Sequence, residues 1–223
     1  MKERAEASAE TSLWWRSFAL RPVESKEIPD IAKLKTYCFF CDTKRTQYVA
    51  DELSGLNIFI KVFEPIVTNN ITNSGIIVKE TLRLLPGYVF AYSEDVISIS
   101  DWDKILKTDG IIKPLGKESA REEIEKDERG NVQSIDYSLK DKGDSDFAKL
   151  LYGLGGRLDQ IHLKDDGSHC TLVDNAWPDD IEATIVKVDR RKSRAKIMFM
   201  FAGRCFTTWV AAEIEEEEKE EGR

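Results

Sequence analysis

The sequence has few residues of the kinds that build metal centres or acid–base sites. It has four cysteines and two histidines among 223 residues, and neither histidine has a nucleophile or carboxylate at motif spacing. Cys38 and Cys41 form a single Cys-x-x-Cys pair, and no second pair follows. Strand residues three positions apart point to opposite faces, which predicts buried, reduced thiols in place of a zinc site. We therefore expect no metal and no cofactor.

The sequence also lacks motifs of nucleotide binding and of membrane insertion. No phosphate-binding glycine loop and no nucleophile–base arrangement occurs, so we expect a protein that is not an enzyme. No apolar run approaches the roughly 18 residues that a spanning helix needs. Met1–Glu10 is charged and lacks the apolar core of a signal peptide. These absences predict a cytoplasmic protein with no membrane partner.

Charge is present but unevenly distributed. The net charge is −8, and the tail Glu213–Glu221 is strongly acidic. The stretch Ile185–Arg204 instead contains seven basic residues and one acidic residue, a local charge of +6. Such a concentration predicts a nucleic-acid contact, with a solubilising turn as the alternative.

One stretch, Leu82–Tyr92, organises the first half of the chain. It alternates aromatic and aliphatic residues in the order Tyr88, Val89, Phe90, Ala91 and Tyr92. This period of two predicts a strand with two apolar faces, entered at Pro86-Gly87. We expect one face to pack on helices and the other to keep its rings available; a plain core strand is the alternative.

The order of the remaining patterns predicts an α+β protein. Over 35–116 we expect strand–helix–strand–strand–helix–strand, a ferredoxin-like sandwich, with its helices at Lys44–Leu53 and Asp101–Lys107 capped near Asp42 or Thr43 and at Ser100. Residues 117–160 are charge-dense and predict a linker with a short helix near Phe147–Leu154. Short strands then predict a small β-barrel at 165–214, made of segments 169–173, 182–188, 194–201 and 204–210.

The two ends of the chain lie outside these modules. Residues 1–34 form an extension that carries Trp14-Trp15, which either docks on the protein's core or contacts a partner. Residues 215–223 form an acidic tail that we expect to be solvated.

Motifs in both modules resemble a known family. The stretch Leu85-Pro86-Gly87-Tyr88-Val89 resembles the "FPGYV" signature of the N-terminal (NGN) domain of the NusG family of transcription elongation factors, and Tyr37, Thr43 and Arg45 are similar to its first strand and turn. The second module resembles the KOW-type, SH3-like barrel that ends such proteins, in the segments Val173–Trp177, Glu182–Asp189, Lys192–Ile197 and Phe201–Arg204. The resemblance covers 36–115 and 168–214.

Departures from the family pattern point to a specialised member. Thr36 stands where the family usually has tryptophan, Leu85 replaces an aromatic residue, and Ala183 replaces a glycine. Alanine fits poorly where φ is positive. These differences resemble antitermination paralogues such as RfaH and LoaP, and the basic turn Asp189–Lys196 is more similar to LoaP.

The resemblance implies binding and no chemistry. It implies that the N-terminal domain binds the clamp helices of the largest RNA polymerase subunit through Tyr37, Leu85, Tyr88 and Ile111. Nascent RNA or DNA would contact basic residues, namely Lys44, Arg45, Arg190, Arg191, Lys192 and Arg194. A small-subunit ribosomal protein or Rho stays open as a further partner of the barrel.

Two other functions remain as alternatives. KOW-type barrels also occur in ribosomal proteins, so a ribosome-associated RNA-binding protein is the first, although the Leu85–Val89 motif argues against it. The second is an enzyme with accessory domains of these types, which the absence of a catalytic constellation disfavours.

Overall fold

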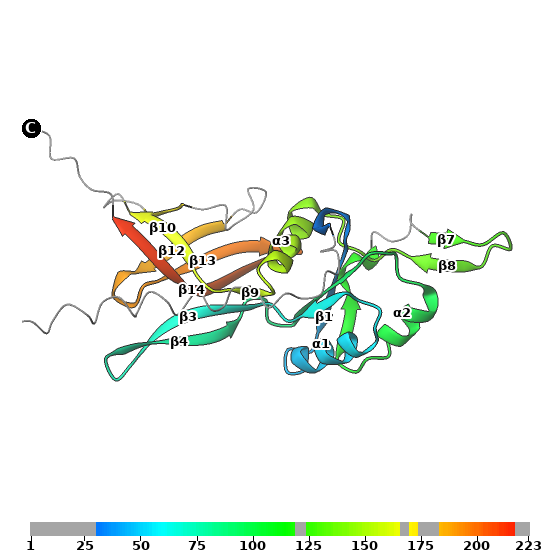
Figure 1. The fold of residues 1–223 in the computed structure, drawn as a ribbon, viewed down its shortest axis with the longest axis horizontal. Helices are drawn as coiled ribbons and strands as arrows, with labels where there is room; N and C mark the ends of the chain where they lie inside the picture. The colour runs from blue at the N-terminus through cyan, green and yellow to red at the C-terminus, as the bar shows by residue number, and fades with distance from the viewer. Residues whose placement is uncertain (1–29, 119–123, 166–169, 174–182, 217–223) are drawn as a thin grey trace, which may run out of the picture. The chain divides into compact units, whose positions relative to one another are not determined.

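The chain folds into a mixed α/β, sheet-rich structure with three α-helices in the part described (Figure 1). The computed structural model describes residues 30–118, 124–165, 170–173 and 183–216. Residues Ile31–Arg223 cluster as one compact unit. The Trp14-Trp15 extension, the Asp174–Ala176 turn and the acidic tail beyond 216 lie outside the described residues.

The helices and strands follow one another in a fixed order along the chain. The first half contains η1 (Ile31–Lys33), β1 (Lys35–Cys41), α1 (Thr46–Gly55), β2 (Lys61–Phe63), β3 (Ile66–Asn73), β4 (Ile76–Arg83), β5 (Tyr88–Ser93), α2 (Ile99–Ile105), β6 (Ile111–Pro114) and η2 (Leu115–Glu118). The second half contains β7 (Ile124–Lys126), β8 (Val132–Ile135), α3 (Lys142–Gly153), β9 (Arg157–Leu158), β10 (Ile161–Asp165), β11 (Cys170–Leu172), β12 (Ala183–Asp189), η4 (Arg190–Lys192), β13 (Arg194–Phe201) and β14 (Arg204–Glu216).

A four-stranded antiparallel sheet of order β2-β5-β1-β6 forms the centre of the N-terminal part. In the β1–β5 ladder Tyr37 pairs with Ala91 and Cys38 pairs with Phe90. All six residues of β5 are buried, which fits a strand covered on both faces. The predicted strand at 88–92 is confirmed as β5. It lies between β2 and β1 in the sheet, in a mixed arrangement of helices and strands that is consistent with the predicted fold class.

Helices α1 and α2 cover one face of this sheet. Their buried side chains, among them Leu53 and Trp102, form a cluster with Tyr37, Phe39 and Val89. Alternate strand residues point to opposite faces, so this cluster takes the odd-numbered positions of β1 and β5. The alternation predicts that one face of β5 packs on helices, and this is the face that carries Val89.

The aromatic side chains of β5 face the other way and are buried as well. Tyr88, Phe90 and Tyr92 belong to a second cluster, together with Phe147 of α3 and Phe201 of β13. The rings of Phe90 and Phe201 lie 5.4 Å apart between centroids. The expectation that this face keeps its rings available is therefore wrong for this structure, because α3 and the C-terminal sheet cover it.

A long hairpin, β3–β4, projects from the sandwich (Figure 1). Its two-residue turn is Ser74-Gly75, both with positive φ, as a hairpin turn of the primed type requires. At its base, β3 also pairs in parallel with β9. The side chain of Asn70 in β3 donates to the carbonyl of Ser193 at 2.7 Å, which fixes the hairpin beside the C-terminal sheet.

The segment that composition assigns to a linker contains ordered structure. Strands β7 and β8 form an antiparallel hairpin (Figure 1), and Ile135 accepts a hydrogen bond from the Trp102 indole at 2.9 Å. The Leu139 amide donates to the Thr36 carbonyl at 2.8 Å. Residues 132–140 therefore pack on the N-terminal domain. Composition alone did not predict this hairpin, because charged side chains such as Glu125 and Lys126 are exposed on it.

The C-terminal residues form a curled five-stranded sheet of order β11-β10-β14-β13-β12. The long strand β14 pairs antiparallel with β13 through Arg204–Ala211 and parallel with β10 through Ala212–Glu216. All four predicted strand segments are found, as β11, β12, β13 and the first part of β14. Ala183, which replaces the usual glycine, is the first residue of β12 and pairs with Phe199 of β13.

Candidate functional site

Tyr88 and Leu85, two of the residues predicted to bind polymerase, lie together at the entry of β5. The Tyr88 amide donates to the Leu85 carbonyl at 3.1 Å, which closes the turn through Pro86-Gly87. Gly87 has φ +88, and a Cβ there would lie 3.2 Å from the Cys41 carbonyl oxygen. Glycine is therefore required at this turn by conformation and by space.

The Tyr88 ring is enclosed by aromatic side chains. Its centroid lies 5.4 Å from that of Phe40, 5.6 Å from that of Phe201 and 5.7 Å from that of Phe206. Tyr88 is only 2% exposed and Leu85 is fully buried. The turn between β13 and β14 thus covers the residue that the motif identifies as the anchor.

Arg204, at the start of β14, completes this enclosure. Its guanidinium lies 5.2 Å from the Phe40 ring centroid, a cation–π contact. Burial raises the pKa of the Tyr88 hydroxyl, and the nearby charge of Arg204 opposes that rise. The cover over Tyr88 therefore combines two phenylalanine rings with one arginine.

Tyr37 and Ile111 lie on the opposite side of the sheet from Tyr88. The Tyr37 ring packs 5.7 Å from Trp102, and burial, with the charge of Asp136, raises the pKa of its hydroxyl. Ile111 is half-buried in β6 against the same cluster. The structure thus brings together Leu85 and Tyr88 but does not bring Tyr37 or Ile111 to them.

Lys44 and Arg45 are exposed at the turn that leads into α1, as the motif predicts. Arg45 forms an ion pair with Asp109. Sequence reasoning missed a third cation, Arg83 of β4, which donates to the Thr43 carbonyl at 2.6 Å. Arg83 and Thr43 are 40 residues apart in the sequence, so no local pattern indicates their contact. The β3–β4 hairpin brings Arg83 to this turn.

The second basic group lies on η4, between β12 and β13. Arg190 donates to Asp165 at 2.6 Å, and Arg194 lies 3.3 Å from Asp189. Arg191 is exposed and Lys192 is half-buried, and within the described part neither forms an ion pair. Arg190 and Arg194, two of the four basic residues predicted here to contact nucleic acid, are thus already paired with carboxylates of the protein itself.

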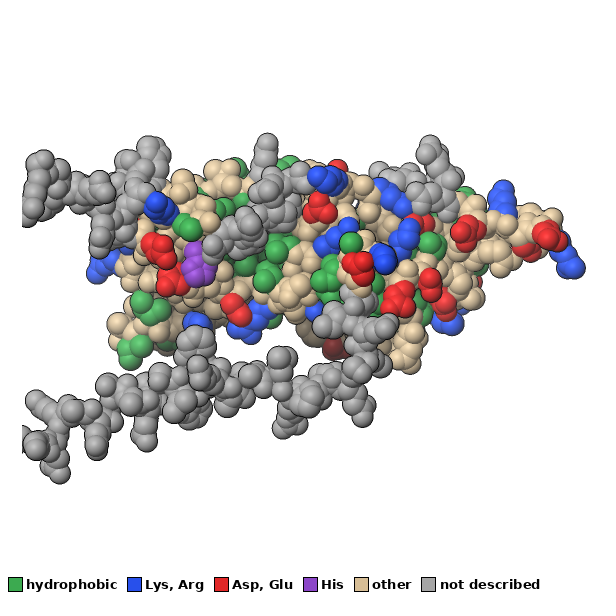
Figure 2. Space-filling model, turned by 45° about the horizontal axis from the view of Figure 1, so that its top comes forward, with side chains coloured by type: hydrophobic (Ala, Val, Ile, Leu, Met, Phe, Trp, Pro, Cys, Tyr) green, Lys and Arg blue, Asp and Glu red, His purple; other side chains and the backbone are tan. Residues whose placement is uncertain are grey.

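Basic and acidic side chains are interspersed over the face of the protein shown in Figure 2. No broad surface of one sign is visible on that face. A nucleic-acid contact would therefore depend on local groups such as the η4 turn rather than on a general positive field.

The matches to known proteins concern the N-terminal part. Residues 35–133 match the family model described as "Transcription termination factor nusG". This stretch is therefore similar to the NusG family, and residues 35–133 are called the NusG-family domain below. No curated protein matches the chain.

The NusG-family domain includes β1 to β7 and ends within β8. It contains Tyr37, Leu85, Tyr88 and Ile111, as well as Lys44 and Arg45. Proteins of this family are transcription factors without enzymatic activity and bind RNA polymerase. The match thus indicates a function of the kind that transcription elongation factors have. The η4 turn lies outside the matched residues.

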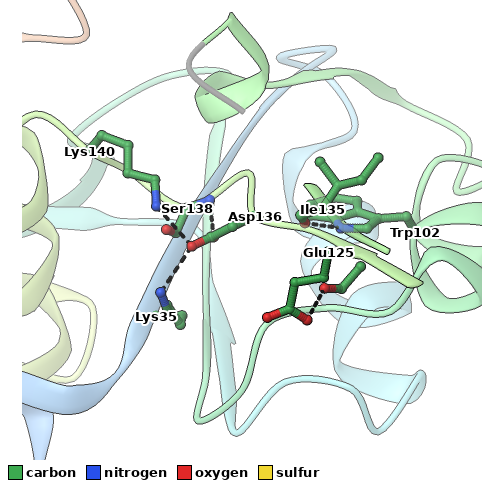
Figure 3. A network of polar contacts seen from close by, with 8 residues as sticks. Lys35, Trp102, Glu125, Ile135, Asp136, Ser138 and Lys140 are labelled. Carbon is green, nitrogen blue, oxygen red and sulfur yellow. Dashed lines mark hydrogen bonds and ion pairs between the residues drawn. The ribbon is translucent and has the colours of Figure 1, made fainter. Parts of the chain in front are cut away.

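A buried carboxylate joins the end of the NusG-family domain to its first strand. Asp136 is 2% exposed and accepts from Lys35 at 2.9 Å, from Lys140 at 2.8 Å and from the Ser138 amide at 2.9 Å (Figure 3). Burial raises the pKa of Asp136, but these hydrogen bonds outweigh it and hold the pKa well below its usual range. Asp136 is therefore a structural anion.

The two cysteines of the Cys-x-x-Cys pair are buried on opposite faces of β1. Both are free thiols, and Cys38 belongs to the Tyr88 cluster whereas Cys41 belongs to the Trp102 cluster. Burial, with the charge of Glu64, raises the pKa of Cys41 to about 12. The predicted geometry is confirmed. Within the described ranges no three His, Cys, Asp or Glu side chains gather as a metal site.

None of the helices in the described residues is both long enough and apolar enough to cross a membrane.

Proposed function

We propose that this protein is a transcription elongation and antitermination factor. In this proposal the NusG-family domain binds the clamp helices of RNA polymerase, and the C-terminal sheet recruits nascent RNA or a protein partner. The observation that supports it most strongly is the match over residues 35–133, which includes the Leu85–Val89 motif at the entry of β5.

Leu85 and Tyr88 are the anchors that we propose for polymerase. Large aromatic side chains seated in apolar pockets supply most of the free energy of many interfaces. Because Phe201 and Phe206 cover Tyr88, the β13–β14 turn has to separate from it before polymerase binds. The binding-competent state is then a minor fraction of the free protein, and weakening the cover raises the apparent affinity.

Co-sedimentation with purified RNA polymerase, and separately with ribosomal subunits, tests the proposal. We expect the full chain to sediment with polymerase, and the Phe206→Ser variant to do so at lower protein concentration. The exposed Thr207→Ala change on the same strand serves as the matched control. Sedimentation with ribosomal subunits alone would replace the proposal by the ribosomal alternative.

Transcription in vitro from a template that contains a promoter and a terminator tests whether the protein acts in antitermination. An antitermination factor increases the fraction of transcripts that pass the terminator, whereas a general elongation factor changes the elongation rate at all positions. We expect increased read-through when the template encodes the cognate leader. Unchanged read-through alongside confirmed polymerase binding would restrict the function to elongation.

A further inference from the structure

The outward face of the C-terminal sheet carries a tryptophan among basic residues. Along β13 every second side chain is buried, namely Ala195, Ile197, Phe199 and Phe201. The alternate positions point outward, and Met198 and Met200 are exposed there. Lys196 shares this outward parity and lies directly opposite Trp209 of β14.

Three strands contribute to one row across this face. Lys187 of β12 pairs with Lys196 of β13, and Lys196 pairs with Trp209 of β14. Residues directly opposite on one face have their Cβ atoms roughly 5 Å apart. The row Lys187–Lys196–Trp209, here called the Trp209 row, thus places two lysines next to one tryptophan on the same face of the sheet.

The Trp209 row is electrostatically unfavourable in the free protein. Like charges directly opposite each other destabilise a sheet. Within the described residues neither Lys187 nor Lys196 forms an ion pair with a carboxylate. A bound anion between the two lysines would remove this repulsion, so the row fits a polyanionic ligand.

Arg194 holds the indole in place. Its guanidinium lies 4.3 Å from the Trp209 ring centroid, and its Nε lies 3.3 Å from Asp189. The Arg194 side chain is only 14% exposed, whereas Trp209 remains partly exposed. Arg194 thus lies over one face of the indole in a cation–π contact, and the partly exposed indole remains accessible to a ligand.

We propose that the Trp209 row binds single-stranded RNA, with one base stacked on Trp209 and the neighbouring phosphates on Lys187 and Lys196. Proteins that bind single strands combine an aromatic platform with cations that follow the backbone, and this row contains both. A duplex keeps its bases stacked on each other and offers no free face to an indole. This inference rests on the proposed contact with nascent RNA and adds to the η4 turn a second surface that contacts the same strand.

Fluorescence anisotropy with the full chain and a labelled single-stranded RNA of about 12 nucleotides tests the row. One lost stack costs roughly 1–3 kcal/mol, so Trp209→Leu should weaken binding about 5- to 150-fold. Trp209→Phe should retain most of the affinity because it keeps an aromatic face. Neither change removes a cation, so the salt dependence of binding should stay as in the wild type.

Substitution of Lys187 and Lys196 tests the proposed phosphate contacts through the salt dependence of binding. Lys187→Gln with Lys196→Gln should flatten the slope of log affinity against log salt by about 1.4, since each single-strand phosphate contact contributes roughly 0.7. Lys107→Gln, at an exposed lysine after α2, is the matched control and should leave the slope unchanged. Circular dichroism checks that each variant is folded; should Trp209→Leu unfold, Trp209→Phe and the lysine pair decide the question.

Several outcomes would overturn the assignment. Wild-type binding to duplex as tight as to the single strand would contradict stacking, and so would an unchanged affinity of folded Trp209→Leu. Tighter binding of DNA of the same sequence would make the ligand DNA. If only changes at Arg191 and Lys192 alter the slope, the proposed RNA contact stands and the Trp209 row has no part in it. If no single strand binds while an acidic peptide does, the face is a protein-docking surface.

Discussion

At the scale of single residues, Asp136 shows how burial and pairing determine the role of a charge. Its carboxylate lies between two lysines from segments about 100 residues apart in sequence, Lys35 on β1 and Lys140 before α3. A buried anion that keeps its partners holds those segments together, whereas one that loses them destabilises the fold. Asp136 therefore connects the end of the NusG-family domain to its first strand.

The Asp136→Asn variant should lower the free energy of unfolding by roughly 2 kcal/mol at pH 7, since two cations lose their partner. The folded-state pKa of Asp136 is depressed, so its stabilising effect is full above the unfolded-state pKa of about 3.9 and is lost as pH falls through the folded value. Urea unfolding at pH 7 and near pH 3 should show the difference between variant and wild type shrinking in acid. An equal difference at both pH values would contradict the ion-pair account.

Gly116 supports a different kind of residue-scale prediction. A Cβ at this position would lie 2.2 Å from the Tyr137 carbonyl oxygen, whereas nothing lies within 4 Å of one at Gly153 in α3. Gly116→Ala should therefore destabilise the protein by about 2 kcal/mol or more, because the 137–138 backbone has to shift. Gly153→Ala should be neutral or stabilise the helix by up to about 1 kcal/mol. Thermal unfolding of both variants checks the contrast, and equal effects would mean that 116 and 137 do not pack together.

At the scale of elements, the η4 turn contains one cation that pairs with a buried carboxylate of the protein and another that is exposed and can contact a ligand. Arg190 pairs with Asp165, which is 5% exposed, while Arg191 is exposed to solvent. Removing one partner of a buried pair costs more than the pair contributes, because the other charge stays buried. Residues that are adjacent in sequence therefore have different roles here.

Arg190→Gln should lower stability while changing RNA affinity only through folding. Arg191→Gln with Lys192→Gln should leave stability within about 0.5 kcal/mol of wild type and flatten the salt slope of RNA binding by about 1.4. Chemical unfolding and a salt titration with the same labelled RNA measure the two effects. The separation of roles would be refuted by a flattened slope in Arg190→Gln at unchanged stability.

At the scale of the whole molecule, the sequence predicted individual strands and helices better than it predicted contacts between distant segments. The alternation at 88–92 identified β5, and short alternating runs identified β12 and β13 within one or two residues. Helix α2 was predicted two residues late: Ser98, not Ser100, accepts from the Asp101 amide. Local periodicity and capping chemistry carry this information, and they are readable without the fold.

The contacts that decide the candidate site were not readable in this way. The cover of Phe201 and Phe206 over Tyr88 joins residues more than 100 positions apart, and hydrophobic alternation is the same whether a face meets the protein's own core or a partner. The β7–β8 hairpin was missed because its exposed faces are charged. Tyr37 was grouped with Tyr88 by motif position, although β1 directs it to the opposite face.

The proposed binding of RNA polymerase through Tyr88 of the NusG-family domain can be tested with a matched pair of variants. Tyr88→Leu and Phe90→Leu each remove one ring from the same face of β5 while keeping an apolar side chain in the core. Affinity for core RNA polymerase, measured by surface-immobilised binding with the full chain, should fall about tenfold or more for Tyr88→Leu and stay within about threefold of wild type for Phe90→Leu. Equal affinities for folded Tyr88→Leu and wild type, or no binding of the wild type to polymerase, would contradict polymerase binding through Tyr88.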